Sequence, residues 1–234
     1  MRRSLPSLFL LSALCGVPAI ADTRYEGKSA REWAQLLENS SSKIRGQAAK
    51  ALGIIGPESV LAVPRLIGLL KDKDADVRHW TAYALSCIGP EAKEAVPALC
   101  RTLKDEDESV ARMAANALGN MAPEGVKEAV PALADTLTAP DHFLRWSAAR
   151  ALACFGAEAK AAVPALSKGV TQDSAGMVRG QLAVTLGSIG PAAKEAVPAL
   201  IEAYENDDYE SVRKQAGSAL KKIDPKAAAK AGVP

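Results

Sequence analysis

The stretch Ala95-Val96-Pro97-Ala98-Leu99 is one copy of a short motif whose repetition decides the fold. A unit of about 33 residues cannot bury its own apolar face, so each copy must stack on its neighbours. The period therefore predicts an all-α solenoid, a fold that usually presents an extended binding surface. The Val-Pro core of the motif occurs five times, with spacings of 33, 34, 33 and 34 residues, at Val63-Pro64, Val96-Pro97, Val130-Pro131, Val163-Pro164 and Val197-Pro198.

Each repeat is predicted to contain two helices, and no strand is evident. The second helix carries Val-Pro, because proline is tolerated in a first helical turn. The first helix ends at glycine or a substitute, often followed by proline, as in Ile88-Gly89-Pro90. It has an inner apolar stripe, such as Val77, Thr81, Ala84, Leu85 and Ile88. The first helix recurs six times, with its first apolar residue at Ile44, Val77, Val110, Leu144, Val178 and Val212.

Arginine follows the first apolar residue of this helix in every copy except the third, which has Ala111. Aspartates occupy the preceding loops and are suited to cap the helices. The arginine column has two interpretations, a ladder that binds an anionic ligand or a set of bonds that join one repeat to the next. The second is favoured. The column contains Arg45, Arg78, Arg145, Arg179 and Arg213.

These features resemble the HEAT repeat family, in the short form that also occurs in phycobilin lyases. The resemblance rests on the Val-Arg start, on the end from Ala51-Leu52-Gly53 to Pro57, and on the Ala-Val-Pro-Ala-Leu motif. It implies an α-solenoid of about six helix pairs, roughly from Lys28 to Asp224. A non-enzymatic protein-interaction scaffold or adaptor is the favoured function, and a ligand-binding or phycobilin-lyase-like enzyme is the alternative.

The two ends of the chain depart from the repeat. Residues 1–21 read as a signal peptide, with Arg2 and Arg3 before an apolar run and the cleavage triplet Ala19-Ile20-Ala21. An exported protein, periplasmic or secreted, without a membrane span after cleavage is therefore expected. Residues 22–43 are expected to form an N-terminal capping helix, residues 44–223 the repeats, and residues 224–234 a C-terminal capping tail.

Charge gives no support for nucleic acid as a partner. The 29 lysines and arginines fall to 27 without Arg2 and Arg3, which equals the 27 acidic residues. Nucleic-acid binders normally carry a basic stripe. Three cysteines remain after cleavage, and a disulfide between Cys87 and Cys100 stays open beside the alternative that Cys87, Cys100 and Cys154 are small packing residues.

The sequence shows no catalytic, metal or cofactor motif. His79 and His142 are the only histidines, and neither a Cys-x-x-Cys pair nor a Gly-x-Ser-x-Gly motif occurs. We therefore expect no enzyme activity, no metal and no cofactor, and we expect a protein or peptide partner.

The candidate binding residues lie two and six positions after the first apolar residue of the recurrent helix, where a helix points away from its core. In the middle repeats these positions hold tyrosine, tryptophan and arginine, which dominate interface energetics. The competing interpretation is that the flanking Trp80 and Met113 fill gaps between repeats and that Trp146 packs along a loop. We name as the ridge His79, Tyr83, Arg112, Asn116, Trp146 and Arg150.

The outward positions of the partner helices differ from the ridge, because their charges alternate in sign. They hold Arg101, Asp135, Lys168 and Glu202, which are expected to pair between neighbouring repeats. This surface therefore has no single-sign field.

Overall fold

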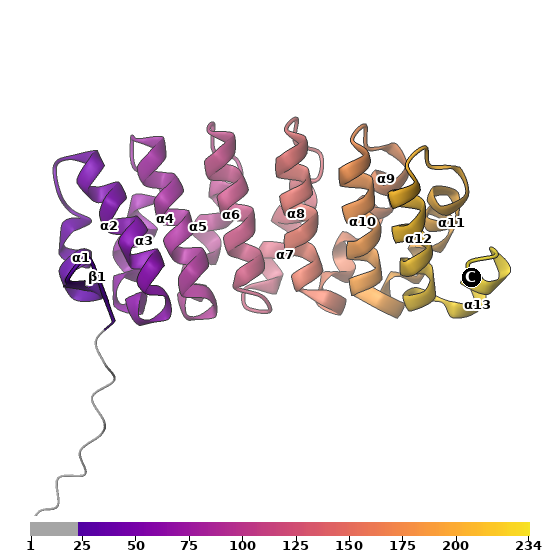
Figure 1. Cartoon of the computed structure of the whole chain (residues 1–234), viewed down its shortest axis with the longest axis horizontal. Helices are drawn as coiled ribbons and strands as arrows, with labels where there is room; N and C mark the ends of the chain where they lie inside the picture. Colours follow the sequence, from indigo (N-terminus) through magenta and orange to yellow (C-terminus); the bar gives the residue numbers. More distant parts are fainter. Residues whose placement is uncertain (1–22) are drawn as a thin grey trace, which may run out of the picture.

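The computed structural model describes residues 23–234, so the predicted signal peptide lies outside the described residues. The chain forms an elongated array of helices in two layers (Figure 1). The all-α solenoid predicted from the period is thereby confirmed. The front layer contains one long helix from each repeat, namely α2 (Ser42–Ile55), α4 (Ala75–Ile88), α6 (Glu108–Asn120), α8 (His142–Cys154), α10 (Gly176–Ile189) and α12 (Glu210–Ile223).

The second layer is formed by the Val-Pro helices, which pack behind the front layer (Figure 1). Proline occupies the first turn in four of them, as the sequence predicts, whereas Pro131 lies inside α7. The helices are α3 (Val63–Leu69), α5 (Val96–Thr102), α7 (Val126–Thr136), α9 (Val163–Gln172) and α11 (Val197–Asn206).

Short 3-10 helices connect the two layers in four repeats. Glycines end the front helices with positive φ values, such as 73° at Gly89, a conformation that glycine adopts readily. The third repeat departs from this pattern, because α6 leads through a turn with left-handed Gly125 directly into α7. The 3-10 helices are η1 (Gly56–Ala62), η2 (Gly89–Ala95), η3 (Gly156–Ala162) and η4 (Gly190–Ala196).

Two rows of leucines form the centre of the core between the layers. Each leucine in both rows is completely inaccessible to solvent. Burying one such side chain stabilises the fold by about 1.5–3 kcal/mol. The leucines of successive repeats therefore contribute similar amounts of stabilisation along the array. The front layer contributes Leu52, Leu85, Leu118, Leu152, Leu186 and Leu220, and the second layer contributes Leu66, Leu99, Leu133, Leu166 and Leu200.

The front helices approach one another closely because small residues lie where they meet. A Cβ atom added to Gly119 would lie 3.0 Å from the Cα atom of Ala151 on the next helix. The same addition at Gly187 would lie 3.1 Å from the Cα atom of Ala219. Glycine is therefore required at these two helix contacts by the proximity of the neighbouring backbone.

The N-terminal segment contains two short strands, β1 (Arg24–Tyr25) and β2 (Lys28–Ser29), which pair in an antiparallel hairpin before α1 (Ala30–Leu36). The expectation of no strand was therefore wrong. The hairpin is too short to show an alternating pattern, but a tight turn at Glu26 and Gly27 closes it. Trp33 of α1 is buried, and its Nε1 donates a hydrogen bond of 3.0 Å to the carbonyl oxygen of Tyr25. At the other end, the tail contains the additional helix α13 (Pro225–Lys230).

The segment Ser42–Leu69 is long and apolar enough to cross a membrane by length and composition. In this fold it is divided among α2, η1 and α3, and 44% of its most apolar window is buried inside the protein. Its apolar residues therefore serve the core between the two layers.

Candidate protein-binding surface

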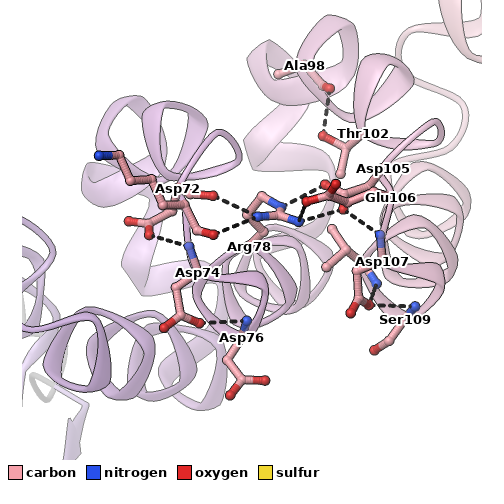
Figure 2. A network of polar contacts seen from close by, with 12 residues as sticks. Asp72, Asp74, Asp76, Arg78, Ala98, Thr102, Asp105, Glu106, Asp107 and Ser109 are labelled. Atoms are coloured by element: carbon pink, nitrogen blue, oxygen red, sulfur yellow. Dashed lines mark hydrogen bonds and ion pairs between the residues drawn. The ribbon is translucent and has the colours of Figure 1, made fainter.

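The arginine column joins successive repeats. Nε and Nη2 of Arg78 each donate a hydrogen bond of 2.8 Å to one carboxylate oxygen of Asp105 in the next repeat (Figure 2). Its Nη1 donates a hydrogen bond to the carbonyl oxygen of Asp72. The hydrogen bonds that Arg78 donates to Asp105 raise the pKa of Arg78, against the opposing effect of burial. The interpretation as bonds between repeats is confirmed. The paired groups are Arg45 with Asp72, Arg78 with Asp105, Arg145 with Asp173 and Arg179 with Asp207.

The ladder is interrupted once, and both partners are missing there. Ala111 stands in the arginine column, and Ala139 occupies the loop position that holds the accepting aspartate in other repeats. A hollow of about 470 Å³, lined in part by Ala111, Ala139 and Leu144, lies at this place. Arg112 instead forms an ion pair of 3.2 Å with Asp141, so this ridge residue also contributes to the contact between repeats.

The six ridge residues lie on α4, α6 and α8, and all are half-buried. The expected outward direction holds less well for the equivalent residues of other repeats, since Gly46 and Gly180 are buried. The reason is the neighbouring front helix, whose side chains cover these positions. An added Cβ at Gly46 would lie 3.7 Å from the Trp80 ring. We call the solvent side of the front layer, from the first apolar residue of each front helix to its end, the front face.

Four ridge residues meet around one hollow of about 430 Å³ between α4, α6 and α8. Ser109 Oγ lies 2.7 Å from Nδ1 of His79, which fixes the imidazole at one side of the hollow. Apolar side chains supply much of the lining. The hollow is lined by His79, Ser109, Arg112, Met113, Asn116, Phe143, Trp146 and Ser147.

Arg150 and Tyr83 extend the ridge on either side of this hollow. Nη2 of Arg150 donates a hydrogen bond of 2.7 Å to Oδ1 of Asn116, and its guanidinium lies 5.9 Å from the centre of the Trp146 ring. Tyr83 meets Trp80 edge to face with 5.5 Å between ring centres. Such contacts hold large aromatic and cationic side chains in fixed orientations. Trp80 and Met113 also pack against the core, as the competing interpretation requires.

Sequence reasoning missed an apolar strip at the N-terminal ends of the front helices. Phe143 is 48% exposed beside the hollow, and Met177 and Tyr209 are exposed in the following repeats. A signal was present, because the residue before the first apolar position is polar or charged in most copies but is Phe143 in one and Met177 in the next. Arg112 lies over the Phe143 ring at 5.7 Å.

The cysteines and acidic groups form neither a disulfide nor a metal site in residues 23–234. Cys87, Cys100 and Cys154 are free, so Cys87 and Cys100 are not joined. Burial raises the pKa of Cys100 to about 11, which keeps its thiol protonated and unreactive at neutral pH. No group of three or more His, Cys, Asp or Glu residues is placed to hold a metal ion in this part of the chain.

The repeated helix pairs, leucine rows and arginine ladder define an α-solenoid of the kind that serves as an interaction scaffold. The chain belongs to the HEAT repeat family. The family model described as HEAT repeats matches residues 30–118, 63–153, 96–187 and 144–221. A search of curated proteins returned no match.

Solved structures share this fold. An engineered protein is 26% identical with a TM-score of 0.67, and the match covers 84% of this chain and 96% of that one. A computationally designed armadillo repeat protein for modular peptide recognition is 22% identical, with a TM-score of 0.64 and coverage of 84% and 100%. The complex of CpcE and CpcF of phycocyanin lyase from Nostoc sp. PCC7120 is similar at 23% identity, with a TM-score of 0.61 and coverage of 97% and 85%.

Proposed function

We propose that this protein is a non-enzymatic, exported adaptor that captures a protein partner on its front face. The observation that carries the proposal is the ridge, where Trp146, Arg150, Tyr83 and their neighbours form an ordered aromatic and cationic surface across three repeats. Interface energy concentrates in such residues when they surround a pocket that excludes water. The hollow beside Trp146 is a place on this surface where a side chain of the partner could displace water.

The rigidity of the surface supports this role. Ridge side chains are already held by hydrogen bonds and ring contacts, so binding would cost little side-chain entropy. The designed armadillo protein with this fold is described as made for peptide recognition, which adds support for a peptide or protein ligand. Export is proposed from residues 1–21, with their basic start, apolar run and Ala-Ile-Ala cleavage triplet.

The test is affinity purification of the tagged mature chain, from Asp22 onward, out of its native cells, followed by mass spectrometry. We expect one reproducible protein partner, and we expect Trp146→Ala with Tyr83→Ala to abolish its recovery while circular dichroism stays unchanged. The matched control is Tyr204→Ala, which removes a half-buried aromatic ring from α11 in the second layer. Undiminished capture by the double variant would contradict the proposal, and a retained small molecule without a protein partner would favour a ligand-binding or lyase-type function.

A further inference from the structure

The front face contains no acidic residue. From its first apolar residue to its C-terminal end, none of the six front helices has an aspartate or glutamate, although the chain has 27 of them. The acidic residues of these helices are confined to the first turn, at Asp76, Glu108 and Glu210. The ranges without aspartate or glutamate are 44–55, 77–88, 110–120, 144–154, 178–189 and 212–223.

Cations outside the arginine column are spread along the same face from α2 to α12. Arg112 and Lys214 each form an ion pair with a carboxylate at the N-terminal edge, whereas Arg150 has a neutral partner in Asn116. Lys50 lies over the Trp80 ring at 4.7 Å. The face therefore has an excess of cationic over acidic side chains, because it contains no carboxylate of its own and, within the described part of the chain, four of its six cations form no ion pair with the carboxylates at its edge. The cations are Lys50, Arg112, Arg150, Lys214, Lys221 and Lys222.

The second layer does not share this charge pattern. Its outward column alternates through Arg101, Asp135, Lys168 and Glu202, all of which are exposed. These side chains form no ion pair with one another in residues 23–234, so the expected pairing between repeats was wrong. The mixed signs still leave this surface without a dominant charge.

We propose that the front face binds an acidic, extended segment of a protein partner, with one apolar side chain of that segment seated in the hollow beside Trp146. The proposal rests on the adaptor function above and specifies the chemistry of its partner. Charge complementarity assigns the acidic character. Met113, Phe143 and Trp146 in the lining assign the apolar anchor.

The dimensions of the face favour an extended peptide. Neighbouring front helices are about 10 Å apart, so the six helices span about 50 Å. An extended chain rises about 3.3 Å per residue, and about 15 residues would cross the whole face. Acidic side chains spaced along such a segment could reach the cations on α2, α6, α8 and α12.

The distribution of acidic residues argues against nucleic acid as the ligand. Asp74, Asp76, Glu108 and Glu210 border the face at the N-terminal ends of the front helices. Each strand of duplex DNA carries a charge about every 3.4 Å along the helix axis, a density that the widely spaced cations of the face do not match. A short acidic peptide can lie between this border and the C-terminal ends of the helices.

The experiment selects ligands from a phage-displayed library of random peptides of about 16 residues, long enough to cross the face. The target is the complete mature chain. We expect enriched peptides to be strongly acidic and to contain at least one Trp, Phe or Leu. Enrichment of neutral or basic peptides, or no enrichment, would overturn the inference.

A synthetic copy of an enriched peptide is then used to test the site by fluorescence anisotropy. The triple variant Lys50→Glu, Arg150→Glu and Lys214→Glu is expected to weaken binding at least about tenfold, and added salt is expected to weaken it further. The control Arg101→Glu, Lys127→Glu and Lys168→Glu applies the same charge change to the second layer and is expected to stay within about twofold. Equal losses in both variants, or tighter binding of single-stranded DNA than of the peptide, would contradict the inference.

The failure of this inference is distinguishable from failure of the adaptor function. If a native partner is captured through Trp146 and Tyr83 but cross-links through a basic or neutral segment, the adaptor function stands and the acidic ligand is wrong. If no capture depends on the ridge, the adaptor function itself is wrong.

Discussion

Both carboxylate oxygens of Asp105 lie 2.8 Å from guanidinium nitrogens of Arg78, which belongs to the preceding repeat. The Arg78 side chain is 9% exposed and that of Asp105 is 10% exposed, so this two-point ion pair is largely shielded from water. A solenoid has contacts only between adjacent repeats, so each such bond couples the stability of one repeat to the next.

Removing this guanidinium is expected to destabilise the array strongly. Arg78→Met leaves the Asp105 carboxylate buried and without its counter-ion, and we expect the free energy of unfolding to fall by about 3 kcal/mol. Arg101→Met, on the exposed face of α5, is the control and is expected to change stability by no more than about 0.5 kcal/mol. Chemical unfolding followed by circular dichroism measures both. Equal losses in the free energy of unfolding for the two variants would show that the ladder ion pair contributes no more to stability than an exposed arginine.

Repairing the interrupted ladder is expected to stabilise the protein. Ala111→Arg and Ala139→Asp together restore the two missing partners at a place where a hollow of about 470 Å³ offers room. Each single variant adds an unpaired charge, so the two changes should be favourable only in combination. A double-mutant cycle is expected to show a favourable coupling of at least about 0.5 kcal/mol. Additive effects would mean that the third repeat does not place the new side chains as the others do.

Stability is expected to fall in acid as the ladder aspartates become protonated. Hydrogen bonds from Arg179 hold the pKa of Asp207 below its usual value, against the opposing effect of burial. The folded chain therefore binds this proton less readily than the unfolded chain, whose aspartates titrate near about pH 3.9. The contribution is complete above that pH and is lost as the pH falls through the folded-state pKa.

The measurement is the free energy of unfolding between about pH 3 and pH 7, compared between the natural chain and Arg179→Met. The variant should lose part of the pH dependence below about pH 4, because the pKa of Asp207 returns toward its ordinary value. Parallel curves for the two proteins would contradict the assignment of this titration to the ladder.

Close helix packing makes a second class of substitution informative. Gly119→Ala would bring a methyl group to 3.0 Å from the Cα atom of Ala151, and backbone must move to accommodate it. We expect a loss of about 1–3 kcal/mol. In Gly68→Ala, which has no atom within 4 Å of the added Cβ, the better helix propensity of alanine is expected to stabilise α3 by up to about 1 kcal/mol. Thermal unfolding of both variants checks the opposite signs.

Most of the fold could be predicted from the sequence because each local signal for a helix start or a helix end occurs in several repeats. Outside the third repeat, the Val-Pro starts, the glycine stops and the arginine column lie where the period places them. The hairpin of Arg24–Ser29 could not be predicted, since strands of two residues have no periodicity. The missing 3-10 helix after Met121 depends on a local turn for which the sequence offers one copy only.

The candidate surface was harder to predict for a physical reason. Helix periodicity gives the direction of a side chain but not the cover provided by a neighbouring helix, so Gly46 and Gly180 were expected outside and are buried. Phe143 was missed because its contribution depends on the hollow formed with Trp146 of the same repeat and Arg112 of the preceding repeat. The acid-free front face was readable in the sequence, but it becomes one surface only when six helices stand side by side (Figure 1).

Site-specific photocross-linking in the native cells tests the central claim most directly. A photoreactive phenylalanine analogue at Asn116, on the front face, is compared with the same analogue at Lys168, on the exposed side of α9. The adaptor account predicts one protein adduct from position 116, its loss when Trp146→Ala is added, and no such adduct from position 168. Identical adducts from both positions, or none from position 116, would contradict it.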